Sequence, residues 1–338
     1  MQVRTTPPVA AATAGAVCIS GSAVLMRLAS APASITALGR CAFALPVLGA
    51  LVLLERRRGA PPMPSRSRWL ARLAGVFLAA DLIMWSHAIT AIGAGLGTVA
   101  GNLEVLIIAL LAWLVLGERP HRSLVLASPV MLTGLALVGG LADVGGSRAY
   151  GTDPALGVAY GVGVAILYAI YILMLRQATS SAGAGTAVAP GARAAVAAPL
   201  FEATAGATAG AVVLGLALRD FHLGPGPSIW PTLGWLALLA LTSQVAGWLL
   251  ITVSMPRLAA GMIGALLLIQ PAGSVALSYV ILGERPSALQ LAGVALVLTG
   301  VLVAVSARTP EAAYSRRRTR IIRQASGAST GRSVSKSP

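Results

Sequence analysis

The chain has 338 residues, of which 57% are hydrophobic and only 10% are charged, and its mean hydropathy is +0.82. Because soluble globular proteins carry about 25% charged residues, this composition argues against a soluble enzyme or a nucleic-acid-binding domain and indicates a polytopic membrane protein. The net charge of +15 arises from basic residues between the apolar runs and in the C-terminal tail. Arginines at such places usually set membrane orientation, so we expect no nucleic-acid partner.

Ten apolar runs follow one another along the chain, each near the 20 or so residues that a membrane-crossing helix needs. They lie at 9–28, 34–54, 69–89, 93–116, 123–142, 155–175, 195–218, 230–252, 259–282 and 288–307. We therefore predict an all-α integral membrane protein with ten transmembrane helices. The polar and basic segment 308–338 is predicted to be a disordered cytoplasmic tail.

The first apolar run shares some features with a secretory signal peptide. Arg4 precedes it, and the small residues 29–31 form a candidate cleavage site. However, Arg27 interrupts the apolar stretch just before that site, and nine further runs follow. We therefore expect an uncleaved first helix.

The basic residues are distributed unevenly between the segments that join the runs. With the N-terminus in the cytoplasm, 20 of the 25 basic residues fall on the cytoplasmic side. Four fall outside, namely Arg27, Arg148, Arg219 and Arg285, and Arg40 lies within the second span. The imbalance follows the positive-inside rule. It predicts a multi-pass protein of the cell membrane with both termini in the cytoplasm.

A short internal repeat divides the chain into two halves. The Leu-Gly-Glu-Arg-Pro run at 116–120 recurs 166 residues later at 282–286, and the Leu-Thr-Gly run at 132–134 recurs at 298–300 with the same offset. We predict a first repeat at 9–142 and a second at 155–307, each with five spans. Because five is odd, the second repeat must insert upside down relative to the first, which is the architecture of secondary transporters.

These features together resemble the drug/metabolite transporter superfamily of the EamA type. The resemblance rests on ten helices in two five-helix repeats, with Gly-Glu-Arg-Pro after the fourth helix of each repeat. Arg40 at the start of the second span and Tyr168 with Arg176 in the sixth add to it. The resemblance covers about residues 9–307. It implies export or exchange of small metabolites, amino acids or drug-like compounds by alternating access.

One pair of repeat-related positions departs from that pattern. In the ninth span Pro271 follows Gln270, as a helix break near the family's central cavity would lead us to expect. In the fourth span Val105 follows Glu104 instead. The sequence therefore predicts that the first half lacks the proline break.

Ionisable side chains within the spans are the first functional candidates, because each costs roughly 2.5–3.5 kcal/mol on insertion scales. Asp81 lies in the third span with Trp85 one turn later on the same face, and we expect it to bind a proton or the solute. Two alternatives stay open: a structural ion pair between Asp81 and Arg40, and a place for Asp81 at the membrane interface. His87, near the outer end of the same helix, is a further candidate.

Glu104 in the fourth span has Gln270 at its repeat-related position. The pair is therefore expected to flank the pseudo-twofold axis at which such transporters bind substrate, with Asn102 as a polar companion. The alternative for Glu104 is a buried, protonated carboxyl group with no transport role. Glu202 in the seventh span is another candidate, although its Ala-, Gly- and Thr-rich surroundings also suit a close helix contact.

Aromatic residues within the spans can line a cavity for an apolar or cationic solute, or they can serve only in packing and interface anchoring. They are Trp85, Tyr168, Tyr171 and Trp248. Three glycines precede Glu104 at four-residue spacing, and we interpret them as a close helix contact.

The predicted function is secondary active export of a small solute coupled to proton uptake. A facilitative exchanger without ion coupling stays open, as do a membrane-embedded lipid-modifying enzyme and a non-transport scaffold. The sequence has no Gly-x-x-x-x-Gly-Lys phosphate loop, and Lys336 is its only lysine, which excludes ATP-driven transport by this chain. The scattered histidines and two buried cysteines, Cys18 and Cys41, suggest no metal site. We expect no enzyme activity and no cofactor. The expected partners are a small solute and membrane lipids, with a homodimer left open.

Overall fold

The computed structural model describes residues 8–117, 122–141, 149–184, 196–221, 229–254, 258, 262 and 266–306. Several sequence predictions fall on other residues. They concern Arg4, the Glu118–Pro120 part of the first Gly-Glu-Arg-Pro run, Arg148, Arg257 and the basic tail at 308–338, all of which lie outside the described residues.

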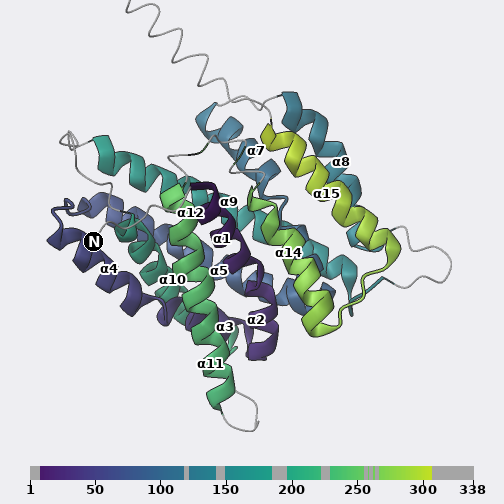
Figure 1. Ribbon diagram of the computed structural model, residues 1–338, viewed down its shortest axis with the longest axis horizontal. Helices are drawn as coiled ribbons and strands as arrows, with labels where there is room; N and C mark the ends of the chain where they lie inside the picture. Colours follow the sequence, from purple (N-terminus) through teal and green to yellow (C-terminus); the bar gives the residue numbers. More distant parts are fainter. Residues whose placement is uncertain are drawn as a thin grey trace, which may run out of the picture. The chain divides into compact units, whose positions relative to one another are not determined.

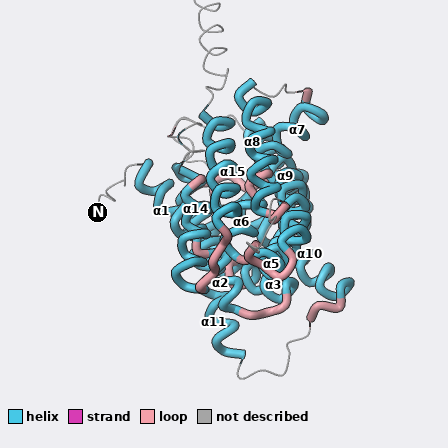
Figure 2. Tube along the Cα trace, turned by 90° about the vertical axis from the view of Figure 1, so that its right-hand side faces the viewer, coloured by secondary structure: helices cyan, strands magenta, loops and turns pink. Residues whose placement is uncertain are grey.

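The regular secondary structure in the described part of the chain is all helical, with no strand (Figure 2). The helices of the first half are α1 (Pro8–Ser20), α2 (Ser22–Ala29), α3 (Ala33–Ala42), α4 (Leu45–Arg57), α5 (Ser65–Ile92), α6 (Ala94–Gly101), α7 (Glu104–Leu116) and α8 (Arg122–Val138). Those of the second half are α9 (Pro154–Ala184), α10 (Ala197–Leu218), α11 (Ile229–Leu239), the π-helix η1 (Ala240–Gly247), α12 (Trp248–Ser254), α14 (Ile269–Leu277), the π-helix η3 (Ser278–Leu282) and α15 (Ala288–Ser306).

Eight helical segments are long and apolar enough to cross a membrane. They are Pro8–Ala29, Ala33–Arg57, Ser65–Ile92, Ala94–Leu111, Pro154–Thr179, Ala197–Leu218, Ile229–Ser254 and Ala288–Val305. Two shorter apolar helices, Arg122–Val138 and Ile269–Leu282, coincide with most of the fifth predicted run and part of the ninth. The prediction of an all-helical, multi-pass membrane protein is confirmed, and eight of the ten predicted spans contain a helical segment of spanning length, counted across short interruptions.

The fourth span is broken between α6 and α7, directly before Glu104. Asn102 and Leu103 form a tight turn in which the backbone N–H of each bonds three residues back, to Val99 and Ala100, at 3.1 and 3.4 Å. Such i→i−3 bonds interrupt an α-helix without any proline. The sequence correctly indicated that the first half has no proline here, but a break is present all the same. In the second half Leu268 is likewise a turn residue, directly before α14 begins.

Glycine allows α5 and α10 to pack with their backbones in contact. A Cβ atom added at Gly75 would overlap the carbonyl oxygen of Ala203, and one added at Gly206 would overlap the carbonyl oxygen of Arg72. Helices in a bilayer are held by such close packing, because lipid provides no hydrophobic force between them. The crossing fixes α5, which carries Asp81, against α10.

Helices α8 and α15 make a second glycine contact and lie side by side in both views (Figures 1 and 2). A Cβ at Gly134 would lie 2.7 Å from the carbonyl oxygen of Gly293, and one at Gly293 would lie 2.5 Å from that of Gly134. This pair joins the last helix of the first half to the last helix of the second.

Helix starts in each half are capped by carboxylates from the other half. Glu55, near the end of α4, accepts hydrogen bonds from the backbone N–H groups of Val196 and Ala197, both at 3.1 Å, at the start of α10. Asp220, just after α10, accepts one from the N–H of Ser34 at the start of α3 at 2.9 Å. An anionic acceptor satisfies the free N–H groups and the positive dipole of a helix start. The α3–α4 segment and α10 therefore run antiparallel and cap each other.

The start of α6 is capped in the same way by Glu284, which is buried. Its Oε1 and Oε2 atoms accept hydrogen bonds from the N–H groups of Ala94 and Gly95 at 2.7 and 3.2 Å. Gly93 precedes them with φ of +97°, a conformation that disfavours any residue with a side chain. The Gly-Glu-Arg-Pro run of the second half thus contributes a helix cap for the first half.

A neighbouring loop is tied to the same end of the bundle by Gln290. Its Oε1 accepts from the N–H of Tyr150 at 2.8 Å, and its Nε2 donates to the Tyr150 carbonyl at 3.1 Å. Burial and then the charge of Glu284 raise the pKa of the Tyr150 phenol above its ordinary value, and Arg27 opposes this shift. The loops at 92–94, 149–153 and 283–287 therefore meet at one end of the bundle.

Candidate functional site

A buried arginine is the centre of the polar network inside the helix bundle. Arg40 of α3 is only 5% exposed. Its Nε donates to Gln244 Oε1 at 3.1 Å and its Nη2 donates to Ser243 Oγ at 3.2 Å. Ser22 donates to the same Ser243 hydroxyl at 2.7 Å, and Gln244 Nε2 donates to Thr204 Oγ1 at 3.2 Å. The network joins α2, α3, α10 and η1.

The π-helix η1 explains how two consecutive residues reach the same arginine. In a regular α-helix neighbouring side chains point about 100° apart. The wider π-helical turn changes this spacing, and π-helical turns occur frequently at functional sites. Here it brings Ser243 and Gln244 to two different nitrogen atoms of Arg40. The third nitrogen, Nη1, is buried and has no hydrogen-bond partner.

Asp81 of α5 is the second buried charged group of this region, at 5% exposure. Its Oδ1 atom is buried without a hydrogen-bond partner. No ion pair within 4 Å joins it to Arg40, although both residues are described, so the alternative of a direct structural pair is not what the structure adopts.

Aromatic rings surround these charged groups. The guanidinium of Arg40 lies 5.8 Å from the ring centre of Trp85, one turn after Asp81 on α5. The ring of Tyr168 lies 5.6 Å from that of Tyr171 and 6.4 Å from that of Trp248. Trp85, Tyr168 and Trp248 are half-buried. The rings of Tyr168 and Trp248 connect α9 with α12.

Glu104 begins α7 and is half-buried. Helix α7 packs against α9, which carries Tyr168. Three of the predicted candidates, Arg40, Asp81 and Tyr168, come from three helices and border one buried cluster. Glu104 lies at the start of the helix that packs on α9. The arrangement presents one cation, two carboxyl groups and a phenol within an apolar bundle. It can bind a small solute that carries charge of either sign or both.

One family model matches both halves of the chain. The family model described as "EamA-like transporter family" matches the chain twice, over residues 6–140 and 155–306. The chain belongs to the EamA-like transporter family. The drug/metabolite transporter resemblance is thereby confirmed, as is the two-repeat architecture. Members of this family are membrane transporters and not enzymes.

A solved structure titled "Crystal structure of protein" shares the fold of this family member. It is 18% identical in sequence with a TM-score of 0.52, over 88% of this chain and 96% of that chain. At this identity the likeness concerns the fold alone. No curated protein sequence matches the chain.

Two other predicted residues of this EamA-like transporter lie near the breaks in the fourth and ninth spans. Asn102 lies at the turn before α7, where its Nδ2 donates to the carbonyl of Thr98 at 2.8 Å. Gln270 lies in the first turn of α14 and is half-buried. The hydroxyl groups of Thr98 and Ser274 are 3.1 Å apart and connect α6 with α14. The two repeat-related spans are thus linked by hydrogen bonds near their breaks.

The last two predicted residues have partners of their own. Glu202 forms an ion pair with Arg72, with 2.6 Å between Oε2 and Nε, and the Arg72 guanidinium lies 5.3 Å from the ring centre of Trp69. His87 is exposed, and its ring stacks on that of Tyr160 with 5.4 Å between the centres. Neither residue makes a hydrogen bond or ring contact to the Arg40 network.

Sequence reasoning missed the hydroxyl members of the network, which are Ser22, Thr204 and Ser243. Serine and threonine are common in membrane helices, and nothing in their spacing points to a shared partner. A signal existed in Arg40 itself, because a buried guanidinium needs several acceptors. Among the described residues, no group of three or more His, Cys, Asp or Glu side chains could hold a metal ion.

Proposed function

We propose that this EamA-like protein is a secondary active transporter that exports a small metabolite, amino acid or drug-like solute by alternating access, driven by proton uptake. The observation that carries the proposal is that Arg40 Nη1 and Asp81 Oδ1 are both buried without a hydrogen-bond partner. A buried charge that is left without a partner is strongly unfavourable. Such groups are retained in a membrane protein where a ligand or proton satisfies them during the working cycle.

In this proposal the solute binds between Arg40 on one side and Asp81 and Glu104 on the other. The rings of Trp85 and Tyr168 cover its apolar part. When the solute leaves, one of the two carboxylates takes up a proton, so that two negative charges never remain together in the apolar bundle. Asn102, Gln270, His87 and Glu202 remain candidates for the pathway that leads to this site.

We further propose ten spans arranged as two inverted repeats, at 9–142 and 155–307. Repeat-related elements pack on each other, as expected about a pseudo-twofold axis: α6 on α14, α8 on α15, and α3–α4 on α10. The packing of α5 on α9 has a repeat-related counterpart in the packing of α12 on α1. The turns at Asn102 and Leu268 are also separated by the repeat offset of 166 residues.

We propose that the protein lies in the cell membrane with both termini, and the 308–338 tail, in the cytoplasm. The positive-inside distribution supports it. Hydrogen bonds support the alternation of ten spans, because they join loops that this topology assigns to one side. Glu284 with Ala94 is such a link on the outer side, and Glu55 with Val196 is one on the cytoplasmic side.

The test is solute uptake into inverted vesicles that hold the purified protein under an imposed pH gradient. In such vesicles uptake corresponds to export from the cell. A panel of amino acids, nucleosides and cationic dyes is used. We expect gradient-dependent accumulation of at least one solute, and a strong loss of accumulation in Asp81→Asn and Glu104→Gln.

The control variant is Leu126→Ala, which truncates a side chain that is 72% exposed on α8 and should leave transport unchanged. Equal accumulation in Asp81→Asn, Glu104→Gln and the unmodified protein would remove both carboxylates from the mechanism. Equilibration without accumulation would replace the proton-coupled exporter by a facilitative exchanger. No movement of any solute, in vesicles shown to contain folded protein, would count against transport of these classes.

A further inference from the structure

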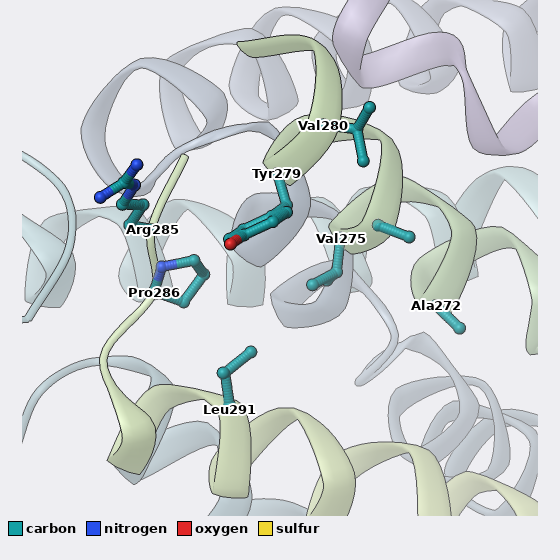
Figure 3. Close-up of a pocket in the computed structure, with 8 residues that line it drawn as sticks. Ala272, Val275, Tyr279, Val280, Arg285, Pro286 and Leu291 are labelled. Atoms are coloured by element: carbon teal, nitrogen blue, oxygen red, sulfur yellow. The ribbon is translucent and has the colours of Figure 1, made fainter. Parts of the chain in front are cut away.

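A groove lies on the surface between the ninth and tenth predicted spans, which are formed by α14 with η3 and by α15. It is away from the Arg40 network. Its volume is about 550 Å³. One wall is formed by α14 and η3, and the other by the loop after η3 and the start of α15 (Figure 3). The lining residues are Ala272, Val275, Ala276, Tyr279, Val280, Arg285, Pro286 and Leu291.

The two ends of the groove differ in chemistry. Figure 3 shows the Tyr279 hydroxyl directed toward the end where Arg285 and Pro286 lie. Ala272 and Val275 lie toward the other end, and the remaining lining is apolar. Because Arg285 follows η3 in an interhelical loop, the polar end is the end at the membrane surface. The groove therefore has the polarity of a single lipid molecule, with a polar head at the surface and apolar chains deeper.

Arg285 has no counter-charge among the residues that the structure describes. The adjacent carboxylate, Glu284, faces inward and uses both oxygens on the N–H groups of Ala94 and Gly95. Arg285 itself is exposed and makes no hydrogen bond or ion pair within the described part of the chain. Tyr279 beside it is 59% exposed, with its hydroxyl group free to donate. An arginine guanidinium and a phenol are well suited to bind a phosphate group.

We propose that this groove binds one anionic phospholipid, whose phosphate contacts Arg285 and Tyr279 and whose acyl chain lies along Val275, Ala276 and Leu291. Charge complementarity selects the occupant, because the free guanidinium would otherwise lie beside an apolar surface without a counter-ion. The surrounding surface is suited to lipid, since Val280 and Ile281 on η3 are 77% and 52% exposed. This site is separate from the proposed solute site and does not depend on transport.

The experiment is native mass spectrometry of the purified protein titrated with phosphatidylglycerol and with phosphatidylcholine of the same chain length. We expect one phosphatidylglycerol molecule to bind with markedly higher affinity than phosphatidylcholine. Arg285→Ala should weaken phosphatidylglycerol binding about tenfold, which is the size expected for a lost charge-assisted hydrogen bond. Arg285→Lys should retain most of the affinity, since it retains the charge.

Two further variants distinguish the groove from general attraction of lipid to a basic protein. Ala276→Phe keeps every charge but places a ring on the exposed groove wall, and it should also weaken binding. Arg58→Ala removes an exposed arginine just after α4 and should leave phosphatidylglycerol binding in the groove unchanged. Equal affinity for both lipids would overturn the proposal, and so would equal losses of phosphatidylglycerol binding in Arg285→Ala and Arg58→Ala. The proposal would also fail if Ala276→Phe dissociated a dimer and left lipid binding unchanged, because the groove would then be an interface between two copies of the chain.

Discussion

Arg40 shows how a single residue organises the interior of this transporter. Its guanidinium binds two residues of η1, lies near the ring of Trp85 and keeps one nitrogen without a partner. This geometry depends on the planar fork of arginine, which presents donors in fixed directions. Lysine carries the same charge as a point without that fork.

Replacing Arg40 by lysine should therefore reduce transport at least tenfold while the protein still folds. A lysine ammonium cannot bond Gln244 and Ser243 in the same geometry and also offer a nitrogen to the solute. The measurement is the initial uptake rate of the solute identified in the vesicle assay, with thermal unfolding as the check on folding. Arg58→Lys, an exposed arginine, is the matched control. An unchanged rate in Arg40→Lys would show that the fork has no role.

At this scale the sequence indicated which charged residues matter but not their partners. Arg40, Asp81 and Glu104 are evident because charge inside a membrane is costly, and this holds whatever the fold is. The roles of Ser243 and Thr204 could not be predicted, because their hydroxyl groups bond to residues 203 and 40 positions away in the sequence. Glu202 was indicated by the same reasoning as Asp81, yet it pairs with Arg72.

Among the elements, the close packing of α5 on α10 depends on glycines at their contact. Gly75→Ala places a methyl group against the backbone of Ala203, and either helix must move. Such overpacking typically costs about 1–3 kcal/mol, so we expect the free energy of unfolding to fall by roughly that amount. The unfolding midpoint should fall with it. Gly234 in α11 has no atom within 4 Å of an added Cβ. Gly234→Ala is thus the same change without the clash and should be neutral or stabilising by up to about 1 kcal/mol.

Unfolding of both variants in detergent micelles, by heat or by denaturant, measures this difference. Equal midpoints for Gly75→Ala and Gly234→Ala would mean that α5 and α10 do not pack as closely as described.

The carboxylate caps make a second prediction about elements. Glu284→Gln should weaken the start of α6 by about 1 kcal/mol, the usual size of a capping and helix-dipole contribution. Hydrogen exchange at Ala94 and Gly95 should rise about fivefold, while exchange at Val196 and Ala197 stays the same. Glu55→Gln should give the opposite pattern. If each variant changed both sites equally, global destabilisation rather than loss of a cap would be the cause.

The positions of the helices could be predicted from apolar run lengths, because a membrane crossing needs a minimum length whatever surrounds it. The interruptions could not. The turn at Asn102 and Leu103 contains no proline, and the π-helical turns of η1 and η3 contain no residue that marks them. These features arise from packing between helices of different halves, which local sequence does not encode.

For the whole molecule, the repeat offset indicated two halves, and the family match confirms two repeats. Orientation in the membrane remains a prediction that labelling can measure. In a variant with Cys18 and Cys41 replaced by alanine, a cysteine is introduced at Thr152 or at Pro62, both of which are exposed. A membrane-impermeant maleimide should label Thr152→Cys in intact cells and Pro62→Cys only after permeabilisation. The reverse pattern would place the termini outside, and labelling of both in intact cells would contradict the alternation of spans.

The exchange of caps between the halves has a consequence for how the protein is made. The first half leaves the ribosome well before the second, yet the acceptors for its helix starts at Ser34 and Ala94 lie 186 and 190 residues further along the chain. Until those acceptors arrive, the N–H groups at these two helix starts lack their carboxylate partners. Both caps therefore form only once the second half has been made. A chain that stops after the first repeat would lack both caps, so the starts of α3 and α6 should be less stable in it than in the full chain.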